Sequence, residues 1–211
     1  MTHALRTLIP AAQSFFTELA ANNSKDWFAA NKARYEADLK TPALALLEAV
    51  SPHVAALADA PVKTKLYRAH RDVRFSKDKS PYKLHLHMLW APQGTGTQPA
   101  YFFGIAPEYV RAGAGIMGFD KEQLSQWRAF ASEREGAELA AKIARSGARM
   151  DPPALKRVPA PFAQDHTNAD LIKRKSCALW LELADDADLE DGLRGAFSAL
   201  NPVMDDLRAF L

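Results

Sequence analysis

The sequence predicts an α+β fold with a mainly antiparallel sheet and helices at both ends of the chain. Strand-like alternation of apolar and polar residues is concentrated in the middle of the chain, and helical stripes of apolar residues occupy its two ends. Strands expected at 101–106 and 109–116 are separated only by Pro107-Glu108, which fits a tight hairpin and leaves no room for a crossover helix.

The 211 residues are expected to form one domain, because chains of this length commonly build a single core. Within it we expect a helical part over 1–60, a sheet part with the main motif over 61–119, and a helical and strand part over 120–211.

The N-terminal part is expected to hold three helical segments. The first covers 11–21 and ends at Asn22-Asn23, after which Ser24 caps a second that runs to about Lys40. Thr41-Pro42 predicts a new helix start, followed by a helix over 44–57 that is bent or interrupted at Pro52.

Five stretches are expected as strands: 66–75, 84–90, 101–106, 109–116 and 176–183. Towards the C-terminus, Asp120 and Gln123 form a capping-box pattern that opens a helix, which Gly136 interrupts and Gly147 ends. Residues 151–161 contain four prolines and are expected to be irregular. A helical stripe then fills 189–211, with Pro202 beginning its second half.

Composition predicts a cytoplasmic protein without a membrane partner. The net charge of +2 is too small to indicate a nucleic-acid partner by itself. The single cysteine, Cys177, excludes an internal disulfide and fits a reducing compartment. We expect no signal peptide and no apolar run near the roughly 18–20 residues that span a bilayer.

Positive charge is concentrated in one stretch, residues 63–83. It holds eight Lys or Arg against Asp72 and Asp78, so the rest of the chain sums to −4. On the strand interpretation of 66–75, Arg71 lies in an otherwise apolar row, and a buried guanidinium needs a carboxylate, a carbonyl cluster or an anionic ligand. A helix would instead bring Arg71 and Phe75 together. Residues 76–80 are expected to form a loop in which Asp78 accepts a backbone N–H.

The spacing of this stretch resembles the signature of a bacterial and fungal family of uncharacterised proteins, domain-of-unknown-function family 2461. The matching residues are Arg68, Arg71-Asp72, Arg74-Phe75, Asp78-Lys79 and Tyr82. The resemblance extends to residues 22–28 with Asn31-Lys32, to Gly113–Gly118, and to residues 155–159 with Asp165-His166. It implies a single domain of about this length and implies no activity.

The cluster is interpreted first as a site for a phosphate- or carboxylate-bearing small molecule. Arginine forks match the oxygens of both groups, and these arginines with Lys79 exceed what one aspartate can neutralise. Asp72 would orient one guanidinium, and Asp72 or a nearby histidine would carry a proton if a reaction takes place. The expected ligand-binding residues are Arg68, Arg71, Asp72, Arg74, Lys79 and Tyr82.

Two alternatives remain open from the sequence. The first is a nucleic-acid-binding module, in which the loop 76–80 with Lys77, Lys79 and Lys83 contacts phosphates and Lys173-Arg174-Lys175 forms a second basic patch. Aromatic residues are sparse there, so we rank it second. In the other, the protein is structural or binds a partner, and the motif is an ion-pair lock between Asp72 and an arginine.

Other patterns are weighed and set aside, and no cofactor or metal is expected. Gly113-x-Gly115-x-x-Gly118 follows a strand and precedes a helix, but no second parallel strand follows. These glycines are expected to mark a bulge and a close backbone approach. His85-x-His87 has metal-compatible spacing, but a third ligand has to come from His53, His70, His166 or Asp72. Cys177 is expected to be a buried strand residue.

Overall fold

The protein was analysed as a computed structural model that describes residues 3–94, 98–184 and 188–209. A six-stranded sheet with the order β1-β2-β3-β4-β6-β5 forms its centre, and all five pairings are antiparallel. The predicted α+β fold is therefore confirmed. The strands are β1 (Val62–Leu66), β2 (Leu86–Pro92), β3 (Ala100–Ala106), β4 (Tyr109–Ile116), β5 (Arg149–Met150) and β6 (Cys177–Glu182).

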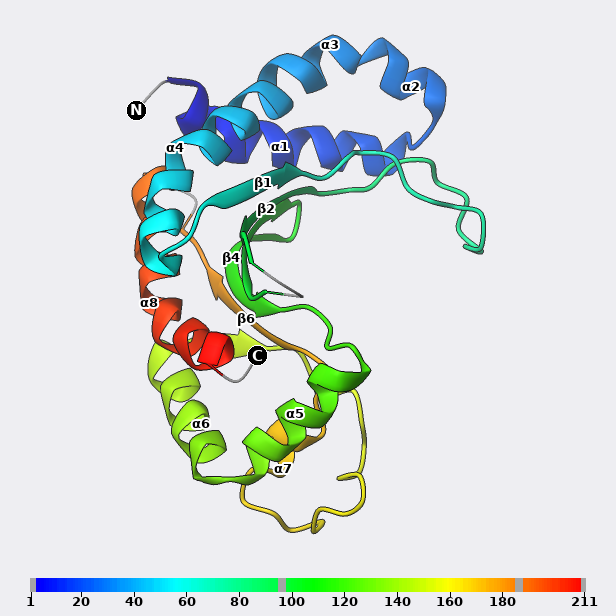
Figure 1. The fold of residues 1–211 in the computed structure, drawn as a ribbon. Helices are drawn as coiled ribbons and strands as arrows, with labels where there is room; N and C mark the ends of the chain where they lie inside the picture. Colours follow the sequence, from blue (N-terminus) through cyan, green and yellow to red (C-terminus); the bar gives the residue numbers. More distant parts are fainter. Residues whose placement is uncertain (1–2, 95–97, 185–187, 210–211) are drawn as a thin grey trace.

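Helices from both ends of the chain cover one face of this sheet. Helices α1, α4 and α8 contact it directly, and α6 packs against α8 (Figure 1). The helical elements are α1 (His3–Ala21), α2 (Lys25–Ala30), α3 (Lys32–Arg34), the π-helical η1 (Tyr35–Lys40), α4 (Thr41–Ala58), α5 (Lys121–Ser132), α6 (Arg134–Ser146), α7 (Ala169–Ile172) and α8 (Leu189–Ala209).

The main core lies between this helical layer and the sheet. Trp90 of β2 donates its indole N–H to the carbonyl of Leu47 in α4 at 3.0 Å. Tyr101 of β3 donates its hydroxyl to Asn201 of α8 at 2.7 Å, and Phe197 packs against both rings. Strand alternation turns the intervening residues to the opposite face, which we call the open face.

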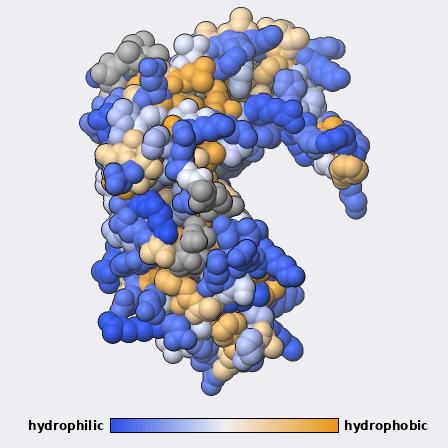
Figure 2. Space-filling model, viewed as in Figure 1, coloured by the Kyte–Doolittle hydropathy of each residue, from blue (hydrophilic) through white to orange (hydrophobic). Residues whose placement is uncertain are grey.

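The open face lines a hollow in the molecule. Figure 1 shows the sheet curving around this hollow with α4 and α8 behind it, and Figure 2 shows the resulting C-shaped outline. A small second apolar cluster lies on the open face, formed by Ala100, Phe102, Ala178 and Trp180.

The N-terminal helices confirm one predicted cap and correct another. Ser24 accepts the backbone N–H of Trp27 and begins α2. Thr41 does not cap a helix: it is the first residue of α4, which continues directly from η1, and its hydroxyl donates to the carbonyl of Glu36. Residues 32–58 therefore form one continuous helical stretch that passes through the π-helical turn.

This stretch also corrects the expectation that no apolar run reaches membrane-spanning length. By length and composition alone, Lys32–Ala58 is long and apolar enough to cross a membrane. Core helices pass the same test, and α4 buries Leu46, Leu47, Val50 and Val54 while it contacts α1, α8, β1 and β2.

In the C-terminal part, the capping box at Asp120 and Gln123 and the helix end at Gly147 are confirmed. The predicted break at Gly136 is wrong, since the helix is interrupted at Glu133. A Cβ at Gly136 would lie 2.3 Å from the carbonyl oxygen of Ala131, so this glycine permits close packing at the start of α6. Helix α8 runs through Pro202 without a new start.

The predicted strand at 66–75 is also wrong. Regular pairing ends at Leu66, and residues 67–85 leave the sheet as a projecting hairpin, which we call the arm (Figure 1). Its two sides are joined by the bridge between His70 and Tyr82 and by hydrogen bonds from Arg71 to Pro81 and from Lys83 to Ala69. Proline has no N–H to extend the ladder, so regular strand structure does not continue towards the tip.

The predicted close backbone approach at the glycine triplet is confirmed for Gly113 and Gly115. Both lie inside β4, which pairs antiparallel with β3 and β6, so the βαβ unit of a dinucleotide site is absent from the described sheet. Gly115 has φ +130°, and a Cβ there would lie 1.9 Å from the carbonyl oxygen of Cys177. These two glycines let β6 approach β4.

Candidate functional site

The base of the arm is held by the asparagine-rich turn before α2. Asn23 donates its side-chain amide to the carbonyl of Tyr82 at 3.0 Å and accepts the backbone N–H of Tyr82 at 3.1 Å. The ring of Phe28 stacks on that of Tyr82 with centroids 4.0 Å apart. Two segments that carry the family resemblance are thus joined directly.

The tip of the arm is held by ion pairs within the motif. Arg71 pairs with Asp78, and Arg74 pairs with Asp72 at 2.6 Å. Asp78 also accepts the backbone N–H of Ser80 at 2.9 Å, which confirms the predicted turn. Its hydrogen bonds with Ser80, followed by those with Arg71, hold the pKa of the Asp78 carboxyl well below its ordinary value.

This geometry corrects one expectation about the arginines and agrees with another. Arg71 has a carboxylate partner, but the pair is not buried, since its side chains are 28% and 59% exposed. Asp72 binds one guanidinium, as expected, and that guanidinium belongs to Arg74. Lys79 donates to the carbonyl of Val73 at 3.0 Å, and Phe75 at the tip is 95% exposed.

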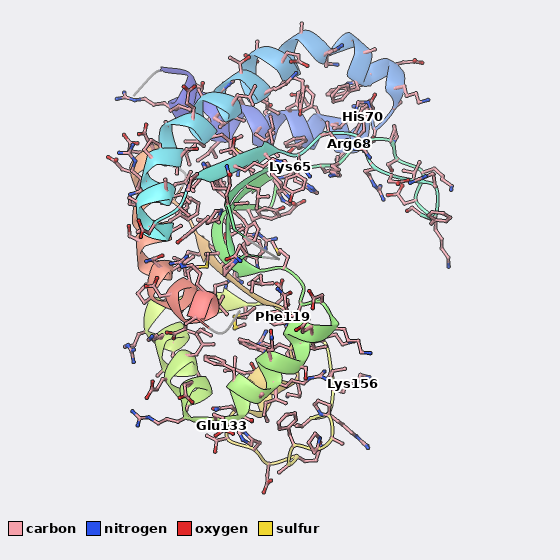
Figure 3. All side chains as sticks on the ribbon, viewed as in Figure 1. Lys65, Arg68, His70, Phe119, Glu133 and Lys156 are labelled. Atoms are coloured by element: carbon pink, nitrogen blue, oxygen red, sulfur yellow. The ribbon has the colours of Figure 1, made fainter. Side chains whose placement is uncertain are left out.

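Arg68 lies away from the tip, in a hollow between the start of the arm and helices α2 to α4. We call this cavity of about 590 Å³ the basic groove. Figure 3 shows Lys65, Arg68 and His70 following one another along the chain from β1 into the arm. The groove is lined by four cationic side chains, Lys32, Lys40, Lys65 and Arg68, by Glu36, His70, Leu44, Leu66 and Ala69, and by the aromatic residues Phe28, Tyr35 and Tyr67.

The charge balance of the basic groove is strongly positive. Glu36, the acidic residue among the described lining residues, is paired with Lys40 at 2.7 Å. None of the carboxylates in the described part of the chain pairs with Lys32, Lys65 or Arg68, although Lys65 lies 4.7 Å from the ring centre of Tyr67. Unpaired cations beside aromatic walls favour an anionic ligand.

The six residues predicted to bind one ligand are distributed over three places. Arg68 lines the basic groove, and Arg71 and Tyr82 line a separate hollow of about 280 Å³ together with Asn23 and Lys83. Asp72, Arg74 and Lys79 lie in the exposed part of the arm. The structure therefore brings Arg71 and Tyr82 together, but it does not gather all six around one cavity.

The two strand histidines contact each other. The rings of His85 and His87 stack with centroids 3.8 Å apart, and Nε2 of His87 is 2.7 Å from the hydroxyl of Tyr109. Burial, and then the nearby positive charges, lower the pKa of His87 to about 3, so its ring is neutral near pH 7. Within residues 3–94, 98–184 and 188–209, no three His, Cys, Asp or Glu side chains are grouped to hold a metal ion.

Two further residues considered in the sequence, Cys177 and Arg174, are buried in the structure. Cys177 is buried as expected, and burial raises the pKa of its thiol to about 12, which leaves it protonated and unreactive. Arg174, the centre of the proposed second basic patch, is only 9% exposed and binds Asp170 and the carbonyl of Asp151. Arg174 therefore links residue 151 to α7 and is not available to bind phosphates.

Two residues of the basic groove, and one arginine on the open face of the sheet, were missed by the sequence interpretation. Lys32 belongs to a matching segment but was given no role, and Lys65 was counted only as part of the charge cluster. Arg111 was also missed, although an arginine among the small residues of β4 is a visible signal. Its partners Tyr109 and Trp180 could not be assigned without the pairing of β4 with β6.

Comparison with known proteins supports the resemblance seen in the sequence. No curated protein matches the chain. The profile of one family, described as "Conserved hypothetical protein (DUF2461)", matches residues 11–206, which include α2, the arm and all six strands. The chain belongs to this family of conserved hypothetical proteins.

Proposed function

We propose that the protein binds a phosphate- or carboxylate-bearing small molecule in the basic groove. Arg68 is the motif residue that contacts the anion, assisted by Lys32 and Lys65. The other motif residues, Arg71, Asp72, Arg74, Lys79 and Tyr82, shape the arm that carries Arg68. The observation that carries the proposal is a cavity in which, among the described residues, Glu36 pairs with Lys40 and leaves Lys32, Lys65 and Arg68 without a carboxylate partner.

The size and lining of the groove support a small molecule. Ligand pockets commonly enclose about 300–1,000 Å³ and combine aromatic walls with a few polar groups. The basic groove, at about 590 Å³, has three aromatic side chains beside its cations. Guanidinium and ammonium groups near an aromatic wall suit an organic anion with a planar or apolar body.

The nucleic-acid alternative has weaker support. It relied on the arm loop and on Lys173-Arg174-Lys175, yet Arg74 is bound to Asp72, Lys79 to a carbonyl and Arg174 to Asp170. Lys77 and Lys83 remain available for phosphates on this hypothesis. The proposal also includes a cytoplasmic setting, which the single buried cysteine supports.

A thermal-shift screen tests the proposal. Nucleotides, sugar phosphates, small carboxylates and short RNA and DNA are compared on the wild type, Arg68→Gln and Arg145→Gln. Arg145 is an exposed arginine of α6, so its variant removes the same charge far from the groove. Because a charge-assisted contact contributes about 1.5–3 kcal/mol, Arg68→Gln should weaken binding about 10–150-fold.

Arg145→Gln should bind the small anion as the wild type does. Stabilisation by oligonucleotides but by no small anion would instead favour the nucleic-acid alternative. Stabilisation by none of these compounds, or equal binding by the wild type and Arg68→Gln, would contradict the proposed site.

A further inference from the structure

A second cavity lies on the open face of the sheet, separate from the lining of the basic groove except for Tyr67. Its volume is about 90 Å³, which suits the head group of a ligand better than a whole molecule. Its walls combine apolar side chains with Arg111 and His87. The lining consists of Tyr67, His87, Met88, Phe102, Phe103, Gly104, Arg111, Met117 and Trp180.

Two glycines allow planar side chains to lie flat on this face. A Cβ at Gly104 would be 2.9 Å from the ring of His87 and 3.2 Å from that of Tyr109. A Cβ at Gly113 would be 2.5 Å from the ring of Trp180. Because ordinary side chains at these positions would displace the rings, the glycines maintain the surface beneath the cavity.

Arg111 is held between two aromatic rings, and no carboxylate of residues 3–94, 98–184 or 188–209 forms an ion pair with it. Its guanidinium carbon is 4.2 Å from the ring centre of Tyr109 and 4.3 Å from that of Trp180. Glu182, its neighbour across the β4–β6 pairing, is bound to Arg149. A guanidinium fixed by two rings is pre-oriented, so little side-chain entropy is lost when it binds an anion.

The cavity lining also contains a buried hydrogen-bond donor without an acceptor. Trp180 is 8% exposed, and its indole N–H has no partner among the described residues. Buried donors are rarely left unpaired, because each lost hydrogen bond carries a desolvation cost. The N–H itself is enclosed by the protein, so it is the ring of Trp180 that forms a wall of the cavity, and a ligand bound beside the ring changes the environment of this N–H.

We infer that this cavity binds the carboxylate group of a small organic acid, with Arg111 as the donor and the ring of Trp180 as a wall beside it. The planar guanidinium fork matches the two oxygens of a carboxylate. The apolar walls, including Phe102 and the 54% exposed Met117, suit an apolar body and disfavour a doubly charged phosphate. This site is distinct from the basic groove and does not depend on the function proposed for it.

Nuclear magnetic resonance of the indole N–H groups tests the inference, because the chain has only four tryptophans. Trp180→Phe identifies the Trp180 signal by its disappearance. Butyrate and benzoate should shift that signal with saturation, whereas butyramide and benzamide, which lack the charge, should not. Arg111→Gln should weaken the carboxylate binding that the Trp180 signal reports by at least about 10-fold, while Arg145→Gln, which removes the same charge from an exposed position in α6, should leave it unchanged.

The three other indole signals report whether each variant remains folded. Arg111→Lys provides a second variant that keeps the charge and removes the fork, and it should also bind more weakly than the wild type. The inference is overturned if the carboxylates leave the Trp180 signal unchanged, if inorganic phosphate shifts it as strongly, or if Arg145→Gln abolishes the effect.

Discussion

At the scale of single residues, close contact between strands imposes the sharpest requirements. Gly115 has a positive φ of +130°, which residues with a side chain rarely adopt, and it directly contacts the backbone of Cys177. Gly118, the last glycine of the same triplet, has open space where a Cβ would lie. The triplet therefore serves the packing of β4 against β6 at its first two positions and is not constrained by packing at its third.

Gly115→Ala should be strongly destabilising. The unfavourable backbone conformation alone costs about 1–3 kcal/mol, and the clash with the Cys177 carbonyl adds to it. Urea unfolding measures the effect, with Gly118→Ala as a control expected to stay near the wild type. Equal stability of the two variants would contradict this account of the glycines.

His87 should make the stability of the protein depend on pH. Its folded pKa of about 3 lies below the ordinary value near 6.5, so the unfolded state binds the proton first as pH falls. The contribution of neutral His87 to the free energy of unfolding is fully present above about pH 6.5. It is lost progressively as the pH falls towards 3, by at most about 1.4 kcal/mol per pH unit.

The comparison variant is His87→Gln, which can keep a hydrogen bond to Tyr109 but does not titrate. Carboxylates shared by both proteins contribute equally, so the wild type should lose more stability between pH 6.5 and pH 4 than the variant does. Unfolding free energies that run parallel across this range would show that His87 is not held neutral by burial.

At the scale of elements, the arm has little regular secondary structure, and it carries most of the family motif. Its tip is closed by exposed ion pairs, which usually contribute only about 0–1 kcal/mol each. Its base is held by Asn23 and by the ring of Phe28 on Tyr82. The base, rather than the charged tip, therefore fixes the direction of the arm.

Asn23→Ala should loosen the arm. It removes two hydrogen bonds to the backbone of Tyr82, each contributing about 0.5–1.5 kcal/mol. Hydrogen exchange should become faster at the amides of Arg71 and Lys83, which bond across the arm. The matched control is Asn22→Ala, because the side chain of Asn22 donates to the backbone carbonyl of Glu18 in α1 and not to the arm. Equal exchange in the two variants would contradict the role of Asn23.

Sequence patterns predicted the elements well where burial alternates regularly. The strands expected at 84–90, 101–106, 109–116 and 176–183 correspond to β2, β3, β4 and β6. Strand β1 was not predicted, because its middle residues, Lys63, Thr64 and Lys65, are exposed at the sheet edge and give no apolar pattern. The arm was mistaken for a strand because its alternation is real, while its pairing stops at Pro81.

At the scale of the whole molecule, the charged motif could be located from the sequence. Which of its side chains line the same cavity could not be predicted. Local spacing predicted the loop turn at Asp78 and the contact of Asp72 with an arginine. The basic groove depends on the contact of the arm with helices far away in sequence, and the Arg111 site depends on the β4–β6 pairing. Neither long-range arrangement is encoded in a single local pattern.

The most direct test of the central claim is an amide chemical-shift titration of the wild-type protein with inorganic phosphate. If the basic groove is the anion site, shifts should saturate and concentrate in residues 28–44 and 65–70, which line it, and Arg68→Gln should abolish them. Shifts centred on the arm loop 72–80, or an unchanged response in Arg68→Gln, would contradict the claim.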